Sequence, residues 1–168
     1  IINFKEGFME TQILYLSLIA GVLALVYAWS KSLWIQKQDC GTDKMKEIGQ
    51  AVKEGAMAFL KSEYKVLTIF VIVAMGLLYV ANRGEGLELI AFSFVVGAVC
   101  SALAGYFGMR VATSANMRAT HGARTGLAEA LNIAFSGGTV MGMCVVGLGI
   151  IGLTGLFLLY TCIVNTIT

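Results

Sequence analysis

The stretch GAVCSALAGYFGMRVATSANMRATHGAR, residues 97–124, decides the fold of this chain. It begins as an apolar run and ends in a short bridge that carries arginines, and a second apolar run follows from residue 133. Small residues recur every four positions in both runs, which places them on one helical face where a neighbouring backbone can approach closely. These residues are Gly97, Ala98, Ser101, Ala102 and Gly105 in the first run and Gly138 and Gly142 in the second. The pattern predicts two closely packed helices joined by a positively charged turn.

The composition of the whole chain is that of a membrane protein. Of 168 residues, 58% are hydrophobic and only 13% are charged, and the mean hydropathy is +0.81. This is too apolar for a soluble domain of this size. The 20 glycines favour close helix contacts in lipid, and because proline is absent the helices can run unbroken from the membrane into water. The net charge of +2 gives no reason to expect a nucleic-acid partner.

Four apolar runs have the length and composition of membrane spans. We therefore expect an all-α, polytopic membrane helical bundle: a single membrane domain over residues 1–168, with four transmembrane helices and cytoplasmic helical extensions. The first run has no clear signal-peptide cleavage site after it, so we expect it to be retained. The expected spans are residues 13–29, 65–80, 89–109 and 133–163.

Two helical extensions are expected on the polar side of these spans. Apolar positions three and four apart predict an amphipathic helix over Met45–Tyr64 that runs directly into the second span, with Thr42 or Asp43 as its N-cap. The alanine-rich stretch Val111–Asn132 predicts a helical continuation of the third span. The glycines within Asn82–Glu88 predict a short turn, which makes the second and third spans antiparallel neighbours.

The positive charges predict the orientation of the bundle. Ten of the twelve Lys and Arg residues lie in the segments between the first two spans and between the last two. Because positive residues are enriched in cytoplasmic loops, we expect both long connections to face the cytoplasm and both chain ends to lie outside.

Two patterns resemble sites but have a simpler structural interpretation. GLGIIG, residues 147–152, matches the dinucleotide fingerprint by its letters, but it lies inside an apolar run without a preceding strand or a later acid, so glycine-mediated helix packing is favoured. The cysteines show no metal-ligand spacing and are expected to be small packing residues. They are Cys40, Cys100, Cys144 and Cys162.

A row of carboxylates is the next candidate. Asp39, Asp43 and Glu47 stand four residues apart, a spacing that aligns side chains on one helical face and suits Mg²⁺ ligands. Lysines surround them, which favours a solvated loop and helix start instead. His121, the single histidine, has no visible partner for catalysis or ligation and is expected to be exposed and structural.

The arginines form a candidate anion cradle. Guanidinium groups match phosphate oxygens, and Arg110, Arg118 and Arg124 lie close in sequence, although the positive-inside rule alone accounts for them. No acidic residue lies at the centre of any expected span, so the chain shows no proton or cation relay of its own. No residue is assigned a catalytic, cofactor-binding or metal-binding role.

Three strings carry a resemblance to a known family. They are EGAMAFLKSEYK (residues 54–65), the stretch 97–124 quoted above, and ALNIAFSGGTVMGMCVVGLGIIGL (residues 130–153). Together they resemble the N-terminal part of the integral membrane inorganic pyrophosphatases, the ion pumps energised by pyrophosphate hydrolysis. The resemblance covers residues 45–160.

This resemblance implies a homodimeric, all-helical pump of about sixteen spans per subunit, by analogy of fold. Such a pump hydrolyses Mg-pyrophosphate on the cytoplasmic side, moves Na⁺ or H⁺ outward, uses Mg²⁺ with K⁺ and Na⁺ as further candidate cofactors, and lies in a prokaryotic inner membrane. Its partners would be the lipid bilayer, the remaining helices of the same pump, a second copy and pyrophosphate. The family motif of the type DVGADLVGKVE is absent here, so no catalytic residue is carried over.

Two hypotheses follow. The first is a structural, outer-ring segment of a longer pyrophosphate-energised pump, inactive by itself. The second is a complete four-helix membrane scaffold or accessory subunit without enzyme activity. An aspartate-rich motif in sequence beyond Thr168 would distinguish the first from the second.

Overall fold

The computed structural model describes residues 4–81 and 89–167, and these residues are almost entirely helical. Each of the four helices is long and apolar enough to cross a membrane, by length and composition. The predicted all-α bundle of four membrane-spanning helices is therefore confirmed. The helices are α1 (Phe4–Lys37), α2 (Asp43–Ala81), α3 (Leu89–Gly122) and α4 (Leu127–Ile167).

Each helix extends beyond the span expected from hydropathy. The amphipathic helix and the second span form one continuous helix, α2, as predicted. No proline interrupts any of the runs, so a helix ends only where glycine or a polar turn takes over. The turn predicted over Asn82–Glu88 lies outside the described residues, but α2 and α3 do pack as antiparallel neighbours.

The prediction of one helical continuation over Val111–Asn132 is wrong. Helix α3 ends at Gly122, a turn follows over residues 123–126, and α4 begins at Leu127. The amide N–H groups of Thr125 and Gly126 both donate to the Gly122 carbonyl oxygen, at 3.0 Å each. Glycine is a poor helix former, and the two glycines of this stretch outweigh the helix propensity of its alanines.

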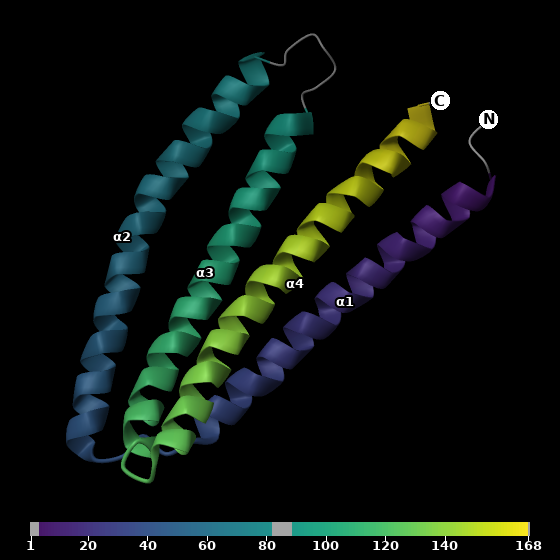
Figure 1. The fold of residues 1–168 in the computed structure, drawn as a ribbon. Helices are drawn as coiled ribbons and strands as arrows, with labels where there is room; N and C mark the ends of the chain where they lie inside the picture. Colours follow the sequence, from purple (N-terminus) through teal and green to yellow (C-terminus); the bar gives the residue numbers. More distant parts are fainter. Residues whose placement is uncertain (1–3, 82–88, 168) are drawn as a thin grey trace.

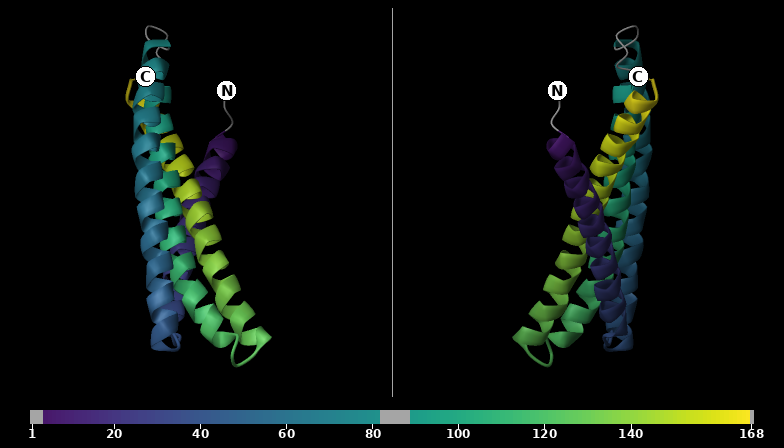
Figure 2. Two further views of the ribbon diagram at one scale, coloured as in Figure 1. Left: turned by 90° about the vertical axis from the view of Figure 1, so that its left-hand side faces the viewer. Right: turned by 90° about the vertical axis from the view of Figure 1, so that its right-hand side faces the viewer.

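In space the helices follow the order α2, α3, α4, α1 (Figure 1), so the first helix of the chain packs on the last. Helix α2 packs only on α3, and α1 and α2 do not pack against each other within the described chain. Both termini lie at one end of the bundle and the α1–α2 and α3–α4 connections at the other. Figure 2 shows that the α3–α4 turn is displaced sideways from the α1–α2 connection, so the layer is strongly twisted.

The predicted small-residue faces are only partly correct. A Cβ atom added at Gly97, Gly138 or Gly142 would meet nothing within 4 Å, whereas one at Gly105 would lie 3.1 Å from the Tyr64 hydroxyl of α2. Small residues spread over more than half of the circumference of α3, so a four-residue repeat alone does not select the contacting face. The close approaches use other glycines, namely Gly21 with Gly147 between α1 and α4, and Gly108 and Gly137 between α3 and α4.

The GLGIIG stretch packs helices, as favoured from the sequence. An added Cβ at Gly147 would lie 3.0 Å from the Gly21 carbonyl oxygen, and one at Gly152 would lie 3.0 Å from Cys100 Sγ. Cys144 is buried in the small core, so packing is confirmed for Cys144 and Cys100. Cys162 is exposed, so its packing role stays a prediction.

The buried core is thin and lies near the end that carries the two connections. Among the described residues, Ile35 and Val140 are the largest side chains that are fully buried, and α2 has no buried residue at all. Most large apolar side chains therefore face outward, as expected for helices whose surroundings are lipid or further membrane helices. The core cluster is Ala28, Ile35, Ala115, Ile133, Val140 and Cys144.

Candidate functional site

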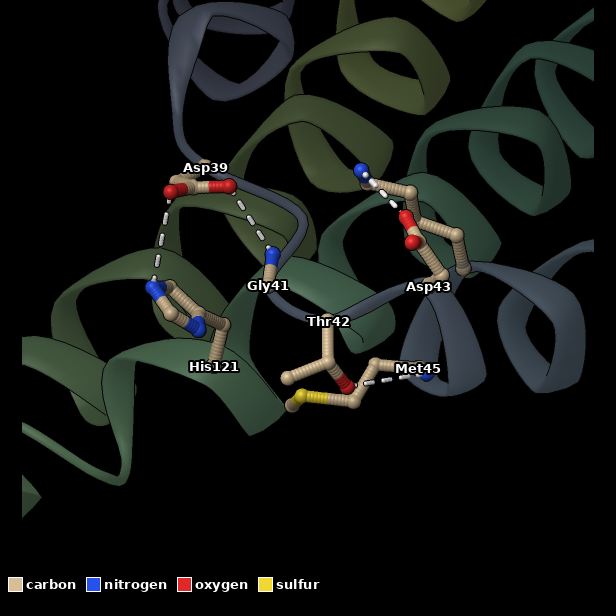
Figure 3. Close-up of polar contacts among 7 residues, drawn as sticks. Asp39, Gly41, Thr42, Asp43, Met45 and His121 are labelled. Carbon is tan, nitrogen blue, oxygen red and sulfur yellow. Dashed lines mark hydrogen bonds and ion pairs between the residues drawn. The ribbon is translucent and has the colours of Figure 1, made fainter.

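Polar side chains converge where the α1–α2 connection meets the C-terminal part of α3. We call this group the connection cluster; it consists of Asp39, Gly41, Thr42, Arg118 and His121. Figure 3 shows Asp39, Gly41 and Thr42 on the connection and His121 reaching them from α3. The cluster joins segments about 80 residues apart in sequence.

Arg118 caps the C-terminal end of α1. Its Nε donates to the Gln38 carbonyl oxygen and its Nη2 to that of Gln36, both at 3.1 Å. Its Nη1 donates to Ser114 O at 2.9 Å and to Ser114 Oγ at 2.7 Å within α3. The last carbonyl groups of a helix have no intrahelical partners, and the guanidinium fork supplies donors to two of them. Arg118 is therefore engaged by the polypeptide and is not a free anion-binding group.

Asp39 links the connection to His121. One carboxylate oxygen accepts a hydrogen bond from the Gly41 amide at 2.9 Å, and the other lies 3.7 Å from His121 Nε2. Gly41 has φ of 77°, and a Cβ there would lie 2.6 Å from His121 Nδ1, so the position requires glycine on two grounds. The hydrogen bond from Gly41 and the charges of His121 and Lys46 hold the pKa of Asp39 below its ordinary value.

The expectation that His121 is exposed and has no partner is therefore wrong, whereas its structural role stays a prediction. Its side chain is 31% exposed rather than free in solvent, and it has a partner, Asp39. The partner is 82 residues away, so no local spacing could reveal it.

A pH titration tests the Asp39 contact. Because the pKa of Asp39 is lower in the folded chain than its ordinary value of 3.8, ionised Asp39 stabilises the fold above that pH. This contribution is lost as the pH falls through the lower, folded pKa. We expect Asp39→Asn, which keeps an acceptor for Gly41, to lower the melting temperature at pH 6 and to lower it less as the pH falls below 3.8. A melting-temperature difference that persists unchanged at pH 2.5 would contradict this assignment.

The carboxylate row is solvated, as favoured from the sequence. Thr42 is the N-cap of α2, because its Oγ1 accepts from the Met45 amide at 3.4 Å. Beyond it, Asp43 pairs with Lys46 at 3.2 Å and Glu47 pairs with Lys44 at 3.0 Å, all at the surface. In residues 4–81 and 89–167 no three His, Cys, Asp or Glu side chains come close enough to hold a metal ion. These residues do not fit a Mg²⁺ site.

The arginines do not form one cradle. Arg110 and Arg118 line a common cavity between the helices, whereas Arg124 lies exposed in the turn after α3 and does not line it. Sequence reasoning found the three cations but not the capping role of Arg118. The only local indication of this role is that Arg118 lies four residues after Ser114, one of its partners. This spacing does not indicate the hydrogen bonds to Gln36 and Gln38.

Comparison with known proteins assigns the chain to a family. Residues 22–168 match the model described as "Inorganic H+ pyrophosphatase". The chain belongs to this family. It is 42% identical over 159 residues to a K(+)-insensitive pyrophosphate-energized proton pump of Caldanaerobacter subterraneus, covering 87% of this chain and 22% of that protein. It is 40% identical over 149 residues to a pump of the same name from Methanosarcina mazei, covering 89% of this chain and 22% of that protein.

A third relative points to a different ion. The chain is 47% identical over 135 residues to a protein of Clostridium tetani assigned as a K(+)-stimulated pyrophosphate-energized sodium pump, covering 80% of this chain and 19% of that protein. The chain thus spans about a fifth of the length of the curated relatives it matches. Membership in the pyrophosphatase family confirms the resemblance found in residues 45–160.

Proposed function

We propose that this chain is the N-terminal, outer-ring segment of a longer pyrophosphate-energised pump, which couples cytoplasmic hydrolysis of Mg-pyrophosphate to outward transport of Na⁺ or H⁺. One observation carries the proposal: the match over residues 22–168 to a family whose members bear these names at 40–47% identity. Relatives of both ion types are similarly close, so the proposal covers both ions.

Within this pump the segment has a structural role. Its carboxylate row and Arg118 are used in a turn, a helix cap and ion pairs, and its described residues do not fit a Mg²⁺ site. The ligands for Mg²⁺, and for K⁺ where it acts, would come from the remaining helices. Pyrophosphate hydrolysis needs such carboxylate-held cations because its transition state is highly charged.

The proposed setting is a prokaryotic inner membrane, with a homodimer as the assembled form. The connection cluster and most Lys and Arg residues lie at or toward the end of the bundle opposite the termini. By the positive-inside rule this end faces the cytoplasm and both ends of the chain face outward.

Phosphate release tests the proposal. The longer natural protein that contains these residues and the 168-residue chain alone are each assayed in membranes with pyrophosphate, Mg²⁺ and varied Na⁺ and K⁺. We expect Mg²⁺-dependent release and ion uptake into inverted vesicles from the longer protein, and none from the chain alone. If neither releases phosphate, a scaffold without enzyme activity is supported instead. Release by the chain alone that is abolished by Asp43→Ala or Glu47→Ala would place catalysis in this segment.

A further inference from the structure

A cavity of about 650 Å³ lies where α1 and α2 flank the α3–α4 pair. Residues from all four helices line it, and α1 and α2 do not close it because they do not pack against each other. Its volume is within the roughly 300–1,000 Å³ of typical ligand sites. Its floor is apolar and includes Val111, Val140 and Cys144.

The lining changes from polar to apolar along the helices. Gly49 of α2 faces Met117 of α3, so Lys53, one turn further along α2, lies within about one turn of the level of Arg110. Both cations line the cavity, together with Gln36 and Gln50, on the side of the two connections. The other end of the cavity, toward the middle of the apolar spans, is lined by Leu25, Phe107 and Leu148.

The charge of the lining is uncompensated. No Asp or Glu of the described residues lines the cavity, and the side chains of Lys53 and Arg110 make no ion pair or hydrogen bond with any of these residues. Arg118 also lines the cavity, but its guanidinium is occupied by backbone carbonyls and Ser114. Trp29, a residue type enriched at the membrane interface, also lines the cavity.

We propose that this cavity binds one anionic phospholipid, with the phosphate at Lys53 and Arg110 and an acyl chain against Leu25, Phe107 and Leu148. Basic pockets between membrane helices at the cytoplasmic face attract anionic head groups, by about fivefold in affinity for each cation. A free phosphate would leave the apolar half of the cavity unused. A further helix would bury both cations without supplying a phosphate.

Native mass spectrometry of the longer natural protein that contains these residues, solubilised in detergent, tests the site. Phosphatidylglycerol and phosphatidylcholine are titrated against the wild type, the Lys53→Gln/Arg110→Gln double variant and a Lys61→Gln/Arg124→Gln control. The control removes one lysine of α2 and one arginine of the α3–α4 turn, both exposed and neither lining the cavity. We expect about 25-fold preference for phosphatidylglycerol in the wild type and the control, fivefold for each of the two cations, and nearly equal binding in the double variant. Equal binding of both lipids by the wild type, or the same loss in the control, overturns the proposal.

A labelling experiment distinguishes a bound lipid from the two other candidate occupants, a segment of the polypeptide and a free phosphate, and leaves both cations in place. The Gln50→Cys variant is made in the longer natural protein that contains these residues. After delipidation, we expect a small maleimide to add one label above the wild-type background. We expect added phosphatidylglycerol to prevent this labelling. Absence of added labelling in the delipidated protein means that another segment of the polypeptide fills the cavity, and the lipid site is refuted. Protection by inorganic phosphate or pyrophosphate as strong as by phosphatidylglycerol assigns the cations to a free phosphate and equally refutes it.

Discussion

Gly147→Val is expected to separate α1 from α4 and to lower the free energy of unfolding by about 3 kcal/mol, the upper part of the range for overpacked sites. A Cβ at this position would lie 2.8 Å from Leu25 Cδ2 and 3.0 Å from the Gly21 carbonyl oxygen. The leucine end can rotate away, but the backbone of α1 can yield only if the two helices move apart. The contact between the first and last helices is thereby lost.

Gly149→Val is the matched control, because Gly149 lies in the same turn of α4 and an added Cβ there would meet nothing within 4 Å. Both variants carry the same change in helix propensity, so the difference between their free energies of unfolding reports the contact with α1 alone. Unfolding of the detergent-solubilised protein by sodium dodecyl sulfate measures both. Equal destabilisation by the two variants would show that the glycines matter only for the helix itself and not for the crossing.

Arg118→Gln should release the C-terminal end of α1 and destabilise the protein by about 2 kcal/mol, within the range for hydrogen bonds from charged groups. Four acceptors lose their donor at once, two in α1 or just after it and two at Ser114. Arg118→Lys is expected to restore less than half of this loss, because one ammonium group lacks the planar fork that reaches both helices.

Hydrogen exchange locates the effect of Arg118. We expect faster exchange of the amides of residues 35–41 in Arg118→Gln, with the remaining helices protected as in the wild type. Arg124→Gln, which removes an exposed arginine in the nearby turn, is expected to leave exchange in residues 35–41 unchanged. Unaltered exchange there in Arg118→Gln would mean that the end of α1 is held without this side chain.

The helices themselves were predictable because their signal is local. Long apolar runs without proline leave the backbone no alternative to helix in lipid, and this reasoning located all four. The end of α3 was missed because alanine content suggested continuation, whereas Gly122 and Gly126 set the turn. Because helix propensity was summed over the whole stretch, the effect of the two glycines on the backbone was overlooked.

The contacts between helices were less predictable. Small residues over more than half of the circumference of α3 left the contacting face open. The crossing of Gly21 with Gly147 joins two segments that are far apart in the sequence. The pairs Asp39 with His121 and Arg118 with Gln36 are also long-range, and nothing in the spacing of either partner indicates the other. The family, by contrast, was identifiable from short strings alone, and all three strings lie within residues 22–168, which match the family model.

The packing of α1 on α4 sets an order on synthesis. When α2 emerges from the ribosome, α1 finds no partner in it, since these two helices do not pack together. The first pair that can dock is α2 with α3. Helix α1 has only a small contact with α3, which includes the hydrogen bonds of Arg118 to its C-terminal end, and it must wait for its main partner until the last of the four helices has been made. A membrane insertase that held the first helix back until that moment would therefore suit this topology better than one that released helices two at a time.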